Sequence, residues 1–136
     1  MGLLLLDTSV AVALLLEDHE AHRTCRDAVR GQQLGLAGHA LMETMSVLSR
    51  LPGAQRRSVG AVFSAIEHSF PNTRFLSAEG TRTAASDLAS LGISGGSVYD
   101  ALVGAAAREH DCELATRDVR AVGVYVAMGV RTRNLM

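Results

Sequence analysis

The chain has 136 residues, of which 48% are hydrophobic and 20% are charged, and its formal net charge is −1. This composition fits one domain, residues 1–136, that buries roughly two-thirds of the surface of its unfolded chain. No apolar run reaches the roughly 18 residues that span a bilayer, and the start lacks the features of a signal peptide, so we expect a cytoplasmic protein without membrane contact. All 13 basic residues are arginine, which excludes chemistry that depends on lysine. Cys25 and Cys112 lack CxxC spacing, and we expect reduced thiols.

Predicted strands and helices alternate along the chain. Short apolar runs next to turn or capping residues predict strands, and apolar residues at helical spacing predict helices. The predicted strands cover residues 3–6, 34–37, 74–76, 113–116 and 130–135. The predicted helices cover residues 9–16, 18–30, 39–51, 54–70, 78–91, 98–110 and 119–128, with Asp18 and Ser97 as expected N-caps of two of them. This alternation predicts an α/β fold with a mostly parallel sheet of four or five strands.

Four acidic residues that are far apart in the sequence stand among small or apolar neighbours. They are Asp7, Glu43, Asp100 and Asp118, in the strings LLLLDTS, ALMETMS, SVYDALV and LATRDVR. A carboxylate that leaves water must be paired, protonated or bound to a cation, and no matching set of bases accompanies these acids. The sequence therefore favours a divalent metal ion.

The predicted fold places two of these acids at the edge of the sheet where ligands bind. Asp7 and Asp118 follow predicted strands, and the carboxyl ends of strands are where open α/β sheets bind ligands. Glu43 and Asp100 lie in predicted helices, on faces made of small and apolar residues. We expect the other acids to face water. Asp87 is ambiguous, because its helical neighbours are half polar, and it is either solvent-exposed or an accessory acid of the same pocket.

The strings LDTS, ETMSVLSRLP, YDALVGAAAREH and TRD resemble the motif series of PIN-domain ribonucleases, and in particular the VapC toxins of type II toxin–antitoxin systems. The resemblance covers nearly the full length of the chain. It implies a Rossmann-like α/β/α domain whose four acids hold Mg²⁺ or Mn²⁺. It also implies that Thr8 or Ser9 orients Asp7 or a metal-bound water, and that Thr116 does the same beside Asp118.

The implied reaction is the hydrolysis of a phosphodiester in RNA. Mg²⁺ prefers oxygen ligands and keeps several waters, so a few carboxylates suffice to hold it. A metal-bound water is more acidic than bulk water and attacks the phosphorus in line. We expect Asp100, or Asp7 through such a water, to accept the proton. The expected products carry a 5′-phosphate and a 3′-hydroxyl.

The same resemblance implies partners. They are a VapB-like antitoxin, an RNA substrate and a second copy of the chain, so a homodimer and a toxin–antitoxin hetero-oligomer are expected. The apolar run at 11–16 is a candidate groove for an antitoxin segment. Arg23, Arg26 and Arg30 are candidate contacts to the RNA backbone. The ending VRTRNLM is more basic than is usual in the family, which bears on partner contacts more than on chemistry.

Other functions remain open. A PIN-domain nuclease of RNA maturation or decay has the same acids, and so does an inert PIN module that only binds RNA or protein. A phosphoacceptor or phosphatase domain also places an aspartate after its first strand, but such domains require a lysine. The histidines lie near predicted helix ends or lack the spacing of a zinc site, and we interpret them as surface groups.

Overall fold

The computed structural model describes residues 2–136. At its centre is a sheet in the order β2-β1-β3-β4, and every pairing in it is parallel. The strands are β1 (Leu3–Leu6), β2 (Gln33–Leu36), β3 (Glu113–Thr116) and β4 (Thr132–Asn134). Leu4, Leu5 and Leu6 are fully buried, as expected for a parallel strand that helices cover on both faces. The predicted α/β fold is confirmed.

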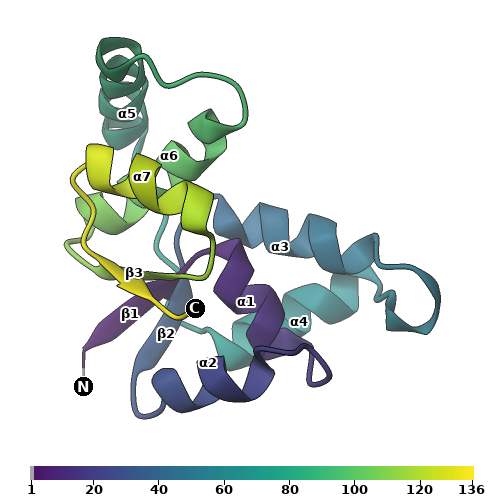
Figure 1. Cartoon of the computed structure of the whole chain (residues 1–136). Helices are drawn as coiled ribbons and strands as arrows, with labels where there is room; N and C mark the ends of the chain where they lie inside the picture. The colour runs from purple at the N-terminus through teal and green to yellow at the C-terminus, as the bar shows by residue number, and fades with distance from the viewer. Residues whose placement is uncertain (1) are drawn as a thin grey trace.

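Helices flank the sheet on two sides. They are α1 (Thr8–Leu15), α2 (His22–Ala28), α3 (Ala40–Ser49), α4 (Val59–Ser69), α5 (Ala78–Leu91), α6 (Ser97–Glu109) and α7 (Val119–Ala127), with a short 3-10 turn η1 (Gly53–Gln55). Figure 1 shows α1 to α4 gathered on one side of the sheet and α5 to α7 on the other. The packing agrees, because α1 contacts α2 and α3, whereas α6 contacts α5 and α7. Among residues 2–136, no helix is both long and apolar enough to cross a bilayer.

The predicted strand at 74–76 is wrong. This segment runs beside β2 and forms only an isolated bridge between Ala37 and Arg74. The Thr73 hydroxyl accepts the N–H of Leu36 at 3.1 Å in place of a backbone carbonyl, which ends the ladder on the Asn72 side of the bridge. On the other side the chain turns into α3 at Gly38, so residues 75 and 76 have no strand to pair with. Close approach of this segment requires a glycine in β2, because a Cβ on Gly35 would lie 2.0 Å from the Asn72 carbonyl oxygen.

Three predicted helix starts also need correction. The helix predicted over 18–30 begins only at His22, and the Asp18 carboxylate accepts a hydrogen bond from the Gln55 side chain instead of capping it. The helix predicted over 54–70 begins at Val59, because η1 precedes it and the Ser58 side chain caps it. Ser97 is the first residue of α6 rather than its cap, and the preceding Gly96 provides no side-chain bond. A local capping residue therefore sets the start of α4 but not the starts of α2 and α6.

Candidate active site

Two carboxylates lie at the carboxyl edge of the sheet because the strands before them are neighbours. Asp7 follows β1, and its Oδ1 accepts the Val10 N–H at 3.3 Å at the start of α1. Asp118 lies two residues after β3, and its Oδ1 accepts the N–H groups of Arg120 and Ala121 at 3.0 and 3.3 Å at the start of α7. Each aspartate is thus held as a helix N-cap, which favours a negative charge at that point.

Two helices supply the other carboxylates. Glu43 lies in the first turn of α3, and Asp100 lies in the first turn of α6. With Asp7 and Asp118 they line one cleft of about 290 Å³, together with Thr8, Ser9 and Tyr125. The structure therefore brings together all four acids that the sequence singled out, from segments spread over most of the chain.

The acids of this cleft raise one another's pKa values. Burial, followed by the charges of Asp118, Glu43 and Asp7, raises the pKa of Asp100 to about 6. Burial also raises the pKa of Glu43, with a smaller contribution from Asp7, although His39 and the Thr8 hydroxyl oppose the shift. A cleft that resists ionisation in this way carries more negative charge than the protein balances, and a bound cation would relieve it.

Asp7 is the most buried of the four acids. It is 4% exposed, and burial raises its pKa against the hydrogen bonds of Ser9, Thr116, Tyr125 and Val10. Its Oδ1 accepts the Ser9 hydroxyl at 2.5 Å, and Ser9 Oγ in turn accepts the Arg117 N–H at 2.8 Å. Ser9 therefore joins the loop after β3 to the aspartate after β1.

The other two hydroxyls named from the sequence have different partners. Thr8 Oγ1 donates to Glu43 Oε1 at 3.3 Å, so it contacts Glu43. Thr116 is fully buried, and its hydroxyl accepts the Asp118 N–H at 3.0 Å. Thr116 lies behind the cleft rather than in its lining. Thr8 thus links α1 to α3, and Thr116 fixes the turn that carries Asp118.

Sequence reasoning missed Tyr125. This α7 side chain is 1% exposed, and its hydroxyl donates to Asp7 Oδ2 at 2.9 Å across 118 positions of sequence. Burial, and then the charge of Asp7, raises its pKa, so it remains a hydrogen-bond donor. Both oxygens of Asp7 are therefore hydrogen-bonded. The string VGVYVAMG contains no signal for this contact, because the tyrosine looks like an ordinary core residue of a helix.

The donor set fits a hard cation that keeps part of its water shell. Within residues 2–136, no three Asp, Glu, His or Cys side chains converge closely enough to form a direct metal cage. The cleft offers only carboxylate and hydroxyl oxygens, which suit Mg²⁺ or Mn²⁺. Mg²⁺ takes one or two carboxylates and retains several waters, so an open cleft of this kind can hold it where a closed cage is absent.

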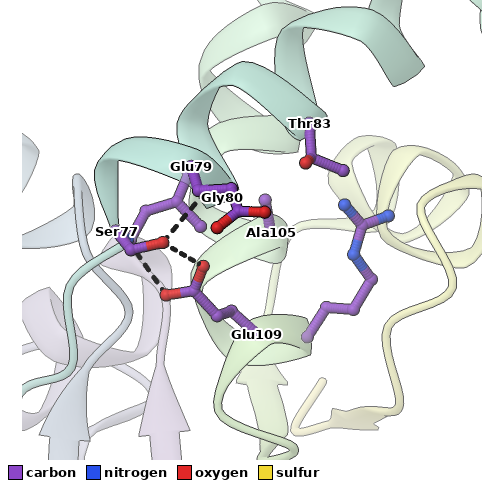
Figure 2. Close-up of a pocket in the computed structure, with 8 residues that line it drawn as sticks. Ser77, Glu79, Gly80, Thr83, Ala105 and Glu109 are labelled. Carbon is purple, nitrogen blue, oxygen red and sulfur yellow. Dashed lines mark hydrogen bonds between the residues drawn. The ribbon is translucent and has the colours of Figure 1, made fainter.

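Asp87 does not join the cleft. Its Oδ2 pairs with Arg108 Nη2 at 2.9 Å. Arg108 also lines a second pocket, between α5 and α6, which Figure 2 shows. There Glu109 accepts the N–H and the hydroxyl of Ser77 at 2.9 and 2.7 Å, and the same hydroxyl caps α5 by accepting the Gly80 N–H. These acids have partners within the protein.

Together these features define an α/β protein with a carboxylate cleft at the edge of a parallel sheet, suited to a hard divalent cation. The model of the PIN domain family matches residues 4–125. The chain therefore belongs to the PIN-domain family.

Curated relatives of this chain are named ribonucleases. The chain is 43% identical over 127 residues to Ribonuclease VapC27 of Mycobacterium tuberculosis (strain ATCC 25618 / H37Rv), with 93% of each chain covered. It is 40% identical over 127 residues to Ribonuclease VapC40 of Mycobacterium tuberculosis (strain CDC 1551 / Oshkosh), with 91% of this chain and 92% of the relative covered.

Solved structures share the fold at lower identity. VapC20 of Mycobacterium tuberculosis, described as a sarcin-ricin loop cleaving toxin, matches with a TM-score of 0.69 and 22% identity over 88% of this chain and 93% of that one. FitAcB from Neisseria gonorrhoeae matches with a TM-score of 0.69 and 19% identity over 99% of this chain and 98% of that one. VapBC2 from Rickettsia felis, bound to a promoter DNA fragment, matches with a TM-score of 0.68 and 14% identity over 98% of each chain.

Proposed function

We propose that this protein is a metal-dependent endoribonuclease and the toxin of a type II toxin–antitoxin pair, with residues 1–136 as one catalytic domain. The observation that carries the proposal is the meeting of Asp7, Glu43, Asp100 and Asp118 in one cleft, where the pKa values of the first three are raised. Curated relatives at 40% identity or more bear the name ribonuclease. We place the protein in the cytoplasm, where RNA substrates are found.

The proposed roles of the side chains follow from their contacts. When bound, Mg²⁺ or Mn²⁺ would acidify a water and stabilise charge on the leaving oxygen. The four acids would hold the ion, one or two of them directly and the others through its water shell, with Asp7 kept in one orientation by Ser9 and Tyr125. Asp100, whose pKa is raised to about 6, would accept the proton of the attacking water at a carboxylate oxygen. A base whose pKa lies near the working pH suits this step.

The proposed protein partner is a VapB-like antitoxin. Fold neighbours of this chain include VapBC2 and FitAB, each determined with DNA. On α1, Leu14 and Leu15 form an apolar part of a surface hollow of about 600 Å³ that residues of α4 also line, and its polar lining includes Glu17, Asp18, His22 and Arg57. An antitoxin helix with an apolar face would fit there. Homodimerisation, a toxin–antitoxin hetero-oligomer and RNA contacts through Arg23, Arg26 and Arg30 stay predictions.

The proposal is tested by expressing the chain in a bacterial host with and without the small gene next to its own, and mapping new RNA 5′ ends. We expect growth arrest that the neighbouring gene relieves, and 5′-phosphate ends that an Asp100→Asn variant does not produce. Cleavage without growth arrest would instead favour an RNA maturation or decay nuclease. Absence of cleavage with intact RNA binding would favour an inert binding module.

A further inference from the structure

A groove along α3 opens directly into the acidic cleft. Its lining includes His39, Met42 and Arg50, and its volume is about 370 Å³. Thr8 and Glu43 line both the groove and the cleft. A polymer whose phosphate lies at the acids can therefore continue along α3 without leaving the surface of the protein. We call this feature the α3 groove.

An aromatic pair lies at the groove: His39 lines it, and Tyr99, which lines neither the groove nor the cleft, stacks on His39. The rings of His39 and Tyr99 are stacked, with centroids 5.4 Å apart and an angle of 25° between their planes. His39 precedes α3, which carries Glu43, and Tyr99 directly precedes Asp100 in α6. The pair thus joins the two helices that supply carboxylates, and it lies beside both of them.

Large apolar surface remains uncovered at this point. Tyr99 is 54% exposed and Met42 is 59% exposed, next to a cleft that strongly favours positive charge. Exposed aromatic and apolar side chains at a polar site mark a place where a ligand covers them. A nucleobase has the required chemistry, because its flat, uncharged face stacks on aromatic rings and it brings no charge toward the acids.

We propose that His39, Tyr99 and Met42 form a binding site for an unpaired nucleobase of the RNA strand next to the scissile phosphate. The proposal rests on the ribonuclease function and adds to it a contact between the protein and one base of the RNA strand. Arg50, at the α3 end of the groove, is exposed, and its Nε donates to the Ser46 carbonyl at 3.2 Å. Its guanidinium supplies a contact for a phosphate of the same strand.

The test separates the contribution of the base to RNA binding from the contribution of the phosphates. RNA binding is measured in an Asp118→Asn background, which prevents cleavage and keeps a side chain able to cap α7. The probes are a labelled oligouridylate and an oligomer of the same length that has ribose and phosphate but no bases. Tyr99→Ala is expected to weaken binding of oligouridylate by about tenfold and to leave binding of the abasic oligomer unchanged. Tyr99→Phe is expected to restore parental affinity.

Two further variants serve as comparisons. Arg50→Ala is expected to weaken binding of both oligomers, with a smaller effect at high salt, as phosphate contacts require. Phe75→Ala removes an aromatic ring of similar exposure, 56%, that neither lines the groove or the cleft nor stacks on His39. It is expected to bind both oligomers as the parent does.

The outcomes distinguish this proposal from the ribonuclease function. Equal affinities of Tyr99→Ala and Phe75→Ala for oligouridylate would overturn the base site, as would an equal loss on the abasic oligomer. Loss of antitoxin binding or dimerisation in Tyr99→Ala without loss of RNA affinity would assign the surface to a protein and also overturn it. If the parent, with all four acids and added Mn²⁺, cleaves no RNA, then the proposed function itself has failed.

Discussion

The acidic cleft and the pocket between α5 and α6 have nearly equal volumes, about 290 and 280 Å³. They shift the pKa values of their carboxylates in opposite directions. In the α5–α6 pocket of Figure 2, hydrogen bonds from Ser77 lower the pKa of Glu109, and Asp87 nearby has Arg108 as its partner. In the acidic cleft, burial raises the pKa values of Asp7, Glu43 and Asp100, and the charges of neighbouring acids raise those of Glu43 and Asp100 further. Carboxylates with partners inside the protein stabilise the fold, whereas a cation from outside would relieve carboxylates that crowd one another.

Asp100→Asn should have the largest effect. Removal of the proposed proton acceptor and metal ligand is expected to reduce cleavage by at least about a hundredfold, measured on a labelled RNA with Mn²⁺. The metal-free variant should at the same time be more stable than the parent at pH 7, by about 1 kcal/mol once solvent screening is allowed for. Asp87→Asn is the matched control, since it should cleave normally and lose about 0.5 kcal/mol of stability. Normal cleavage by Asp100→Asn would remove the basis for the catalytic assignment.

The second largest effect is expected in metal binding, which should involve the acidic cleft and not the α5–α6 pocket. Mn²⁺ at about a hundredfold excess over its dissociation constant is expected to stabilise the parent by about 2–3 kcal/mol against unfolding. The same addition should stabilise Asp87→Asn equally and Asp100→Asn much less. Thermal melts with Mn²⁺ and with a chelator measure this. An equal shift in all three proteins would place the bound ion outside the acidic cleft.

Tyr125→Phe tests whether the hydroxyl positions Asp7 for metal. It should cost about 1 kcal/mol of stability, because one buried hydrogen bond is lost, and it should weaken Mn²⁺ binding severalfold in calorimetry. Ser77→Ala, which removes the cap of α5, should cost a similar amount, about 1 kcal/mol, and leave Mn²⁺ affinity unchanged. If both variants bind Mn²⁺ like the parent, Tyr125 only stabilises the fold.

The smallest expected difference is in pH dependence. The lowered pKa of Glu109 contributes stability that is present above its unfolded value of 4.5 and is lost as the pH falls through its folded value. The raised pKa of Asp100 acts in the opposite direction, because metal-free stability falls as the pH rises from 3.8 toward about 6. Glu109→Gln should flatten the acid side of the stability curve, and Asp100→Asn should flatten the fall between these two pH values. Chemical denaturation across this range measures both slopes, and identical curves would contradict the comparison.

Local sequence patterns were sufficient to predict the bounds of elements whose hydrophobic runs and capping residues lie within or next to them. The buried runs of β1 and β3 and the ends of α5 agree with their predicted bounds. Helix starts near Asp18, Ser58 and Ser97 were misplaced because several capping residues compete within a few positions, and packing decides among them. The segment 74–76 failed as a strand because the Thr73 hydroxyl ends the ladder on one side of the bridge and the chain turns into α3 at Gly38 on the other.

The four acids could be singled out from the sequence because a charge among apolar neighbours is costly wherever it folds. Two of them could also be placed, since the carboxyl ends of adjacent parallel strands meet. Tertiary structure alone decided which groups touch them: Tyr125 on Asp7, Thr8 on Glu43, and the His39–Tyr99 pair beside the cleft. These contacts join residues 35 to 118 positions apart, and no local pattern of hydrophobicity or capping carries information over such distances.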